Sequence, residues 1–160
     1  MTAKRKPDSS VQAEGEAMPN AYESDLYAWA NEQAALLRAG RFAAADMDNI
    51  AEEIEALART EKRELISRLA VVLLHLLKWR FQSEKKTRSW ELSIEEHRRQ
   101  LAIHLRENPS LKSHVSEAMA DGYYLALVRA QRQTGLPRKT FPPTCPFTLQ
   151  QILDDSFWPQ

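Results

Sequence analysis

The feature that most constrains the fold is a stretch from Asp46 to Phe81 that contains neither glycine nor proline. Apolar residues recur along it at helical spacing: Met47, Ile50, Ile54, Leu57, Leu65, Leu69, Val72, Leu73, Leu76 and Leu77. This period predicts one helix of about 36 residues, which we favour over two helices meeting at residues 59–61. Residues 69–77 are apolar on nearly all sides, so we expect them to form the buried axis of the fold.

The rest of the chain also favours helix, because glycine is scarce and unbranched side chains are abundant. We expect an all-α protein, a single helical bundle of four main helices, one of them long and central, plus a short C-terminal helix. A second main helix is expected from the cap Ser24 to about Ala39, just before Gly40. A third has Trp90 and the capping-box pattern Ser93-x-x-Glu96 near its start and is stopped by Asn108-Pro109. A fourth runs from the cap Ser110 to Gly135. The small residues Ala118, Gly122 and Ala126 would allow a close helix approach.

The C-terminal part begins with residues 136–147, which contain four prolines and are therefore predicted to form an extended loop. Thr148-x-x-Gln151 has the pattern of a capping box and predicts a short helix ending near Asp154. The apolar end, Phe157-Trp158-Pro159, is expected to fold back onto the bundle.

Charge and cysteine content narrow the class of protein. The chain of 160 residues carries 22 basic and 22 acidic residues and a single cysteine, so an internal disulfide is impossible and general polyanion binding is disfavoured. No apolar run approaches the ~20 residues of a membrane span. We expect residues 1–21 to form a disordered tail, residues 22–160 to form one domain, and the protein to stay in the cytoplasm.

The first candidate site combines acids with a histidine. Glu52 and Glu53 belong to an acidic stretch on the long helix, and His75 stands in its most apolar part. A solvated acidic face and a hydrogen-bonded core histidine are the simpler explanation. The alternative is a polar cluster of Glu52, Glu53, His75, Arg68 and Arg98, in which a Glu53–His75 pair would support acid–base or metal chemistry.

A second candidate is the basic and aromatic segment from Lys78 to Arg99. Its cations Lys78, Arg80, Lys85, Lys86 and Arg88, interleaved with tryptophans, would suit a nucleic-acid backbone and stacked bases. The simpler explanation is that Trp79 and Trp90 are core anchors beside a solvated loop, and the neutral whole chain favours it.

No other motif predicts chemistry. His97 and His104 are two helical turns apart, too far to bind one metal without further ligands, and no metal-binding motif is present, so we expect no metal and no cofactor. Cys145, within Pro-Pro-Thr-Cys-Pro, has no nearby group to lower its pKa, which disfavours a catalytic role.

Several blocks taken together resemble a known family. They are Tyr22-x-x-Asp25-Leu26-Tyr27-x-Trp29, Asp48-Asn49-Ile50-x-Glu52-Glu53-Ile54-Glu55, Leu74-His75-Leu76-Leu77-Lys78-Trp79, Ser89-Trp90, Thr134-Gly135-Leu136-Pro137 and Phe157-Trp158-Pro159. In this order they are similar to the bacterial family called domain of unknown function 29. The resemblance implies an all-helical bundle with no established activity, cofactor or catalytic residues.

The sequence therefore favours a non-enzymatic protein-interaction or regulatory module of the bacterial cytoplasm. Its expected partner is a protein rather than a nucleic acid or a membrane, and its oligomeric state is open. Two alternatives stay under consideration: an enzyme or metal site on Glu53 and His75, and a nucleic-acid-binding module that uses residues 78–99.

Overall fold

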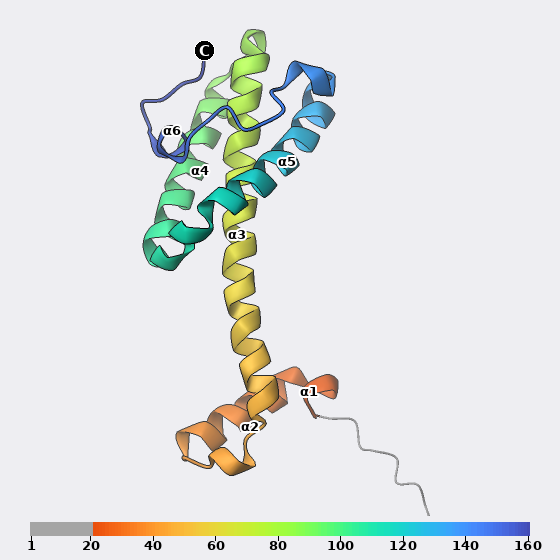
Figure 1. Ribbon diagram of the computed structural model, residues 1–160, viewed down its shortest axis with the longest axis vertical. Helices are drawn as coiled ribbons and strands as arrows, with labels where there is room; N and C mark the ends of the chain where they lie inside the picture. Colours follow the sequence, from red (N-terminus) through yellow and green to blue (C-terminus); the bar gives the residue numbers. More distant parts are fainter. Residues whose placement is uncertain (1–20) are drawn as a thin grey trace, which may run out of the picture. The chain divides into compact units, whose positions relative to one another are not determined.

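A computed structural model describes residues 21–160, and every regular element in that part of the chain is a helix (Figure 1). The all-α prediction is confirmed. The described chain divides into two compact units, the first ending at Glu53 and the second comprising Ile54–Gln160. Residues 1–20 of the predicted tail lie outside the described residues, and Ala21 already begins a helix.

The first unit contains α1 (Ala21–Ser24), α2 (Leu26–Arg38), the short 3-10 helix η1 (Phe42–Ala44) and the first turns of α3. The predicted cap at Ser24 is wrong by one residue. Asp25 caps α2 instead, because its carboxylate accepts a hydrogen bond from the backbone N–H of Ala28 at 2.9 Å. The predicted end is confirmed, since Gly40 adopts a left-handed φ of 68° just after the helix.

Two side chains of α2 are buried within the first unit, Trp29 and Gln33. Both bond to Asp46: the Trp29 Nε1 donates to its carboxylate at 3.2 Å, and the Gln33 Oε1 accepts from its backbone N–H at 2.8 Å. Leu26, the first residue of α2, is exposed. Polar contacts to one residue therefore hold α2 against the start of α3.

The long helix α3 runs unbroken over 35 residues, Met47–Phe81, which confirms the prediction of a single helix. Its burial is uneven. Most apolar residues from Leu65 to Leu77 are almost completely inaccessible and form the axis of the core, as expected, although Ile66 and Val71 are only partly buried. Ile54 and Leu57, in contrast, are exposed. The difference arises because α4 and α5 pack along the later part of α3 (Figure 1).

Two helices of twenty residues each, α4 (Arg88–Glu107) and α5 (Val115–Thr134), pack on α3. The approach of α5 is close, because a Cβ on Gly122 would lie 3.0 Å from the Cβ of Leu69. The short 3-10 helices η2 (Ser83–Lys85) and η3 (Pro109–His114) precede α4 and α5.

Both caps predicted for these helices are wrong. Ser93 lies inside α4, whose cap is Thr87, because the Thr87 hydroxyl accepts a hydrogen bond from the backbone N–H of Trp90 at 3.3 Å. Ser110 lies inside η3, since Pro109 starts a 3-10 helix first, and α5 begins only at Val115. The predicted end of α5 at Gly135, with φ 73°, is confirmed.

The C-terminal segment forms the 3-10 helix η4 (Arg138–Thr140), an irregular loop and α6 (Leu149–Leu153). Both bonds of the predicted Thr148–Gln151 capping box are present. The apolar end folds back as expected: the Trp158 ring lies 4.6 Å from that of Trp79, and Pro159 is buried. This return places α6 beside α4.

Candidate functional site

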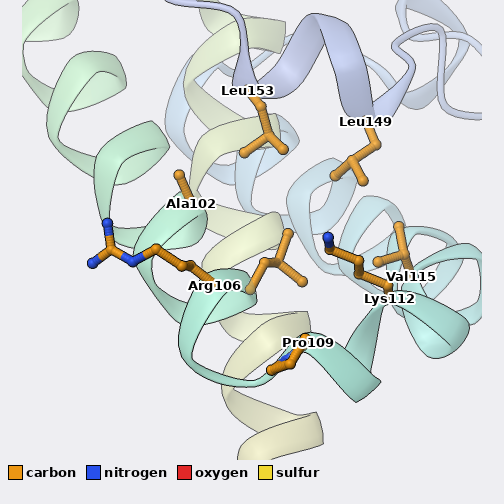
Figure 2. Close-up of a pocket in the computed structure, with 8 residues that line it drawn as sticks. Ala102, Arg106, Pro109, Lys112, Val115, Leu149 and Leu153 are labelled. Carbon is orange, nitrogen blue, oxygen red and sulfur yellow. The ribbon is translucent and has the colours of Figure 1, made fainter.

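An open pocket of about 480 Å³ lies in the second unit, bounded by the end of α4, η3, the start of α5 and α6 (Figure 2). Most of its lining is apolar; the lining residues are Ala102, Leu105, Arg106, Pro109, Lys112, Val115, Leu149 and Leu153. A volume of this size is in the range of ligand pockets, which combine apolar walls with a few polar groups. The pocket is therefore suited to apolar side chains or a small apolar group.

The turn between α4 and α5 forms one side of the pocket. Asn108 ends α4, with its side-chain amide donating to the His104 carbonyl at 3.2 Å, and Pro109 begins η3. Proline suits the first position of a helix, where no N–H bond is lost. The resulting turn brings Lys112 and Val115 opposite the end of α4.

Two cations, Arg106 and Lys112, flank the apolar lining. Both are exposed, and within residues 21–160 neither side chain makes a hydrogen bond, ion pair or ring contact. Figure 2 shows the Lys112 ammonium pointing toward Leu149, while the Arg106 guanidinium lies beside α4, away from the other lining side chains. The pocket thus presents positive charge at two separate points of its rim.

A buried arginine holds the α6 wall in place. Arg98 of α4 is only 1% exposed, and its guanidinium donates to the carbonyls of Ile152 at 2.9 Å and Phe157 at 2.6 Å, with a longer contact to Gln151. Its Nη1 atom is buried without a hydrogen-bond partner. Burial lowers the pKa of Arg98. Because α6 carries Leu149 and Leu153, this arginine positions one wall of the pocket.

The other members of the predicted polar cluster have separate partners. Arg68 pairs with Glu64 at 2.8 Å and donates to Gln100 of α4 at 3.0 Å. The half-buried His75 has its Nδ1 atom 2.9 Å from the Val71 carbonyl, and its ring lies 5.8 Å from that of His97. Since a carbonyl only accepts, Nδ1 carries the proton in the neutral ring. Burial lowers the pKa of His75, which favours that neutral form.

The acidic residues have local roles in the first unit. Glu53 accepts a hydrogen bond from the Tyr22 hydroxyl at 2.7 Å, which raises the pKa of Tyr22 to about 12. Hydrogen bonds from the Asn49 side chain and from Trp29 lower the pKa of Asp46. Glu52 is exposed. Glu53 and His75 each bond to a different group, and no cluster of three or more metal-binding side chains occurs in the part of the chain described.

The basic segment is largely engaged within the molecule. The ammonium groups of Lys78 and Lys86 lie over the rings of Trp90 and Trp79, at 4.4 and 4.7 Å from their centroids. Arg88 pairs with Glu91 at 2.8 Å.

Two further cations complete the segment. Arg80 lies over the ring of Phe81, whereas Lys85 is exposed in η2. With both tryptophan rings already contacted by cations of the same chain, the geometry favours the role of structural anchors over base stacking.

Sequence reasoning missed the pocket, and it considered His104 only as a metal ligand and not as a buried contact between helices. His104 has its Nε2 atom 3.1 Å from the Glu61 carbonyl and its Nδ1 atom 3.7 Å from the Glu61 carboxylate, which joins α4 to α3. Neither Arg106 nor Lys112 was a candidate. The Asn108-Pro109 break and the Thr148 capping box were the available signals, since they mark the turn and the helix that enclose the pocket.

The described residues thus form an all-helical protein with an open, mostly apolar pocket. The family model described as Domain of unknown function DUF29 matches residues 21–158, and the chain belongs to this family. The search of curated proteins and the search of solved structures each found no match. No helix within residues 21–160 is long and apolar enough to cross a bilayer.

Proposed function

We propose that this chain is a non-enzymatic protein-interaction module. Its pocket between α4, η3, α5 and α6 would bind a segment of a partner protein that presents large apolar side chains next to carboxylates. The observation that carries the proposal is the pairing of an apolar lining with two unengaged cations, Arg106 and Lys112.

The physical basis has two parts. Removing apolar surface from water contributes roughly 25 cal/mol per Å², so the side chains that enter the pocket would supply most of the affinity. The cations at the rim are solvated, so they would contribute mainly to partner choice and association rate. A partner with basic residues beside its apolar ones would be disfavoured by like-charge contact.

The geometry gives less support to the two alternatives. Acid–base or metal chemistry on Glu53 and His75 would need these groups to act together, but each is bonded elsewhere. Nucleic-acid binding would need accessible aromatic faces, but cations of the same chain cover Trp79 and Trp90. Location in the bacterial cytoplasm is also part of the proposal and rests on the sequence, namely the family resemblance and a single cysteine.

The test is a selection from a phage-displayed library of random peptides on the full chain, followed by fluorescence anisotropy with the enriched peptides. We expect enriched peptides that combine Leu, Ile or Phe with Asp or Glu. The double variant Arg106→Glu/Lys112→Glu should bind them about tenfold more weakly, since reversal replaces attraction by repulsion at two points.

The matched control is Lys85→Glu/Lys139→Glu, which makes the same change in net charge at two exposed residues that do not line the pocket. It should bind the enriched peptides as tightly as the original chain. The proposal fails if no peptide is enriched, if the enriched peptides lack acidic residues, or if the control variant loses as much affinity as the pocket variant.

A further inference from the structure

Helix α5 has a second apolar face that the second unit leaves partly exposed. Its inner face is built from small residues that pack on α3, including Ala118, Gly122, Ala126 and Ala130. On the opposite side, Tyr124, Leu125 and Val128 are 68%, 37% and 49% exposed. Exposed apolar residues that cluster on one face of a helix are typical of contact sites. The outward face of α5 is therefore a candidate interface.

Opposite charges stand at the two ends of this face. Asp121 precedes Leu125 by four residues, and Arg132 follows Val128 by four, so the four side chains share one side of the helix. Both charged residues are exposed, and within the described chain neither side chain has a hydrogen-bond or ion-pair partner. The order is acid, apolar, apolar, base.

This order is complementary to itself. When a second copy of the helix runs antiparallel, with the two-fold axis midway between Leu125 and Val128, Leu125 of each copy meets Val128 of the other. The same symmetry places Asp121 of each copy opposite Arg132 of the other, so one apolar centre is flanked by two identical ion pairs. An interface that uses the same patch on both subunits is the usual form of a symmetric dimer.

We propose that the outward face of α5, residues 121–132, binds a second copy of this chain as an antiparallel helix pair. This inference is independent of the proposed function, since none of its residues lines the pocket. A pair of helices covers less than the roughly 800 Å² per partner of a standard interface, so we expect a dissociation constant of about 1 μM or weaker. The dimer should therefore appear only as the concentration rises.

The test is sedimentation velocity on the full chain, from about 1 μM to about 1 mM. We expect a concentration-dependent shift from monomer to dimer. Asp121→Arg puts a base at both ends of the face, and Arg132→Asp puts an acid at both ends, so each variant alone should dimerise at least about tenfold more weakly. The two variants mixed in equal amounts should form a heterodimer, because their end charges are then opposite.

The double variant Asp121→Arg/Arg132→Asp provides a second check, since it reverses the polarity but restores self-complementarity and should dimerise like the original chain. Lys139→Asp, an exposed cation outside the face, is the control and should change nothing. A chain that stays monomeric throughout, or a dimer insensitive to the single charge reversals, would overturn the proposal. So would single variants that fail to associate when mixed.

Discussion

Replacing Gly122 by alanine tests the close packing of α5 on α3. The new Cβ would lie 3.0 Å from the Cβ of Leu69, 3.2 Å from the Ile66 carbonyl oxygen and 3.3 Å from the Ala70 nitrogen. Carbon atoms prefer a separation of about 3.5–4.0 Å, so the helices must move apart by roughly 0.5 Å. Two of the three neighbours are backbone atoms of α3, which no change of rotamer can displace.

Two opposing free energies decide the outcome. Alanine in place of glycine stabilises a helix interior by about 0.8–1.0 kcal/mol, whereas overpacking a tight interface costs typically about 1–3 kcal/mol. We therefore expect Gly122→Ala to lower the free energy of unfolding by about 1 kcal/mol, which corresponds to a fall in Tm of roughly 2–4 °C for a chain of this size.

Urea unfolding followed by circular dichroism measures this change. The control Ala120→Gly lies on an exposed part of the same helix and reports the alanine–glycine difference without the steric contact. If Gly122→Ala instead raised the free energy of unfolding by the amount that the control loses, the reasoning about the tight α3–α5 contact would be refuted.

Three further predictions concern the buried Arg98 and the half-buried His75 and Cys145. Arg98→Met should cost about 1–3 kcal/mol of stability, because the carbonyls of residues 148–159 that Arg98 contacts lose their hydrogen-bond donor. Amide hydrogen exchange should become faster in residues 148–159, while α3, α4 and α5 stay protected. Unchanged exchange in residues 148–159 would contradict the anchoring role of Arg98. The folded-state pKa of His75 is below that of the unfolded chain, so its contribution to stability is present above about pH 6.5 and declines as the pH falls below that value. The urea midpoints at about pH 7.5 and 5.5 should therefore differ more for the original chain than for His75→Gln. Equal differences in the two chains would refute this prediction. Burial raises the pKa of Cys145, so iodoacetamide should alkylate it more slowly in the folded than in the urea-unfolded chain; equal rates would count against its burial.

Helices were predictable from the sequence because their signal is repeated many times along each segment. The run without glycine or proline predicted α3, and Gly40 and Gly135 marked helix ends through a backbone conformation that favours glycine. Start positions were less predictable, because several polar residues near the start of a helix can each serve as its N-cap. Asp25 caps α2 where Ser24 was expected, and Thr87 caps α4 where Ser93 was expected.

The candidate pocket was beyond sequence reasoning for a different reason. It depends on Arg98 reaching carbonyl groups more than fifty residues further along the chain, and backbone carbonyls carry no signal of residue type. Arginine and a carboxylate would have suggested a pair, but here the partner is the main chain of α6 and the segment after it. The partner of His75 is also a backbone carbonyl, that of Val71, so the sequence could not distinguish it from the carboxylate partner that we considered.

The equal numbers of acidic and basic residues illustrate why net charge is a poor guide to the surfaces of this protein. Neutrality argues against general binding to polyanions, but it does not distinguish charges that are already paired from charges that remain free. Lys62 and Arg88 are paired within the chain, whereas Arg106 and Lys112 are not. A charge without a partner can bind another protein without first breaking an ion pair of its own chain. The two candidate surfaces, the pocket and the outward face of α5, are therefore the places where such free charges lie beside exposed apolar side chains.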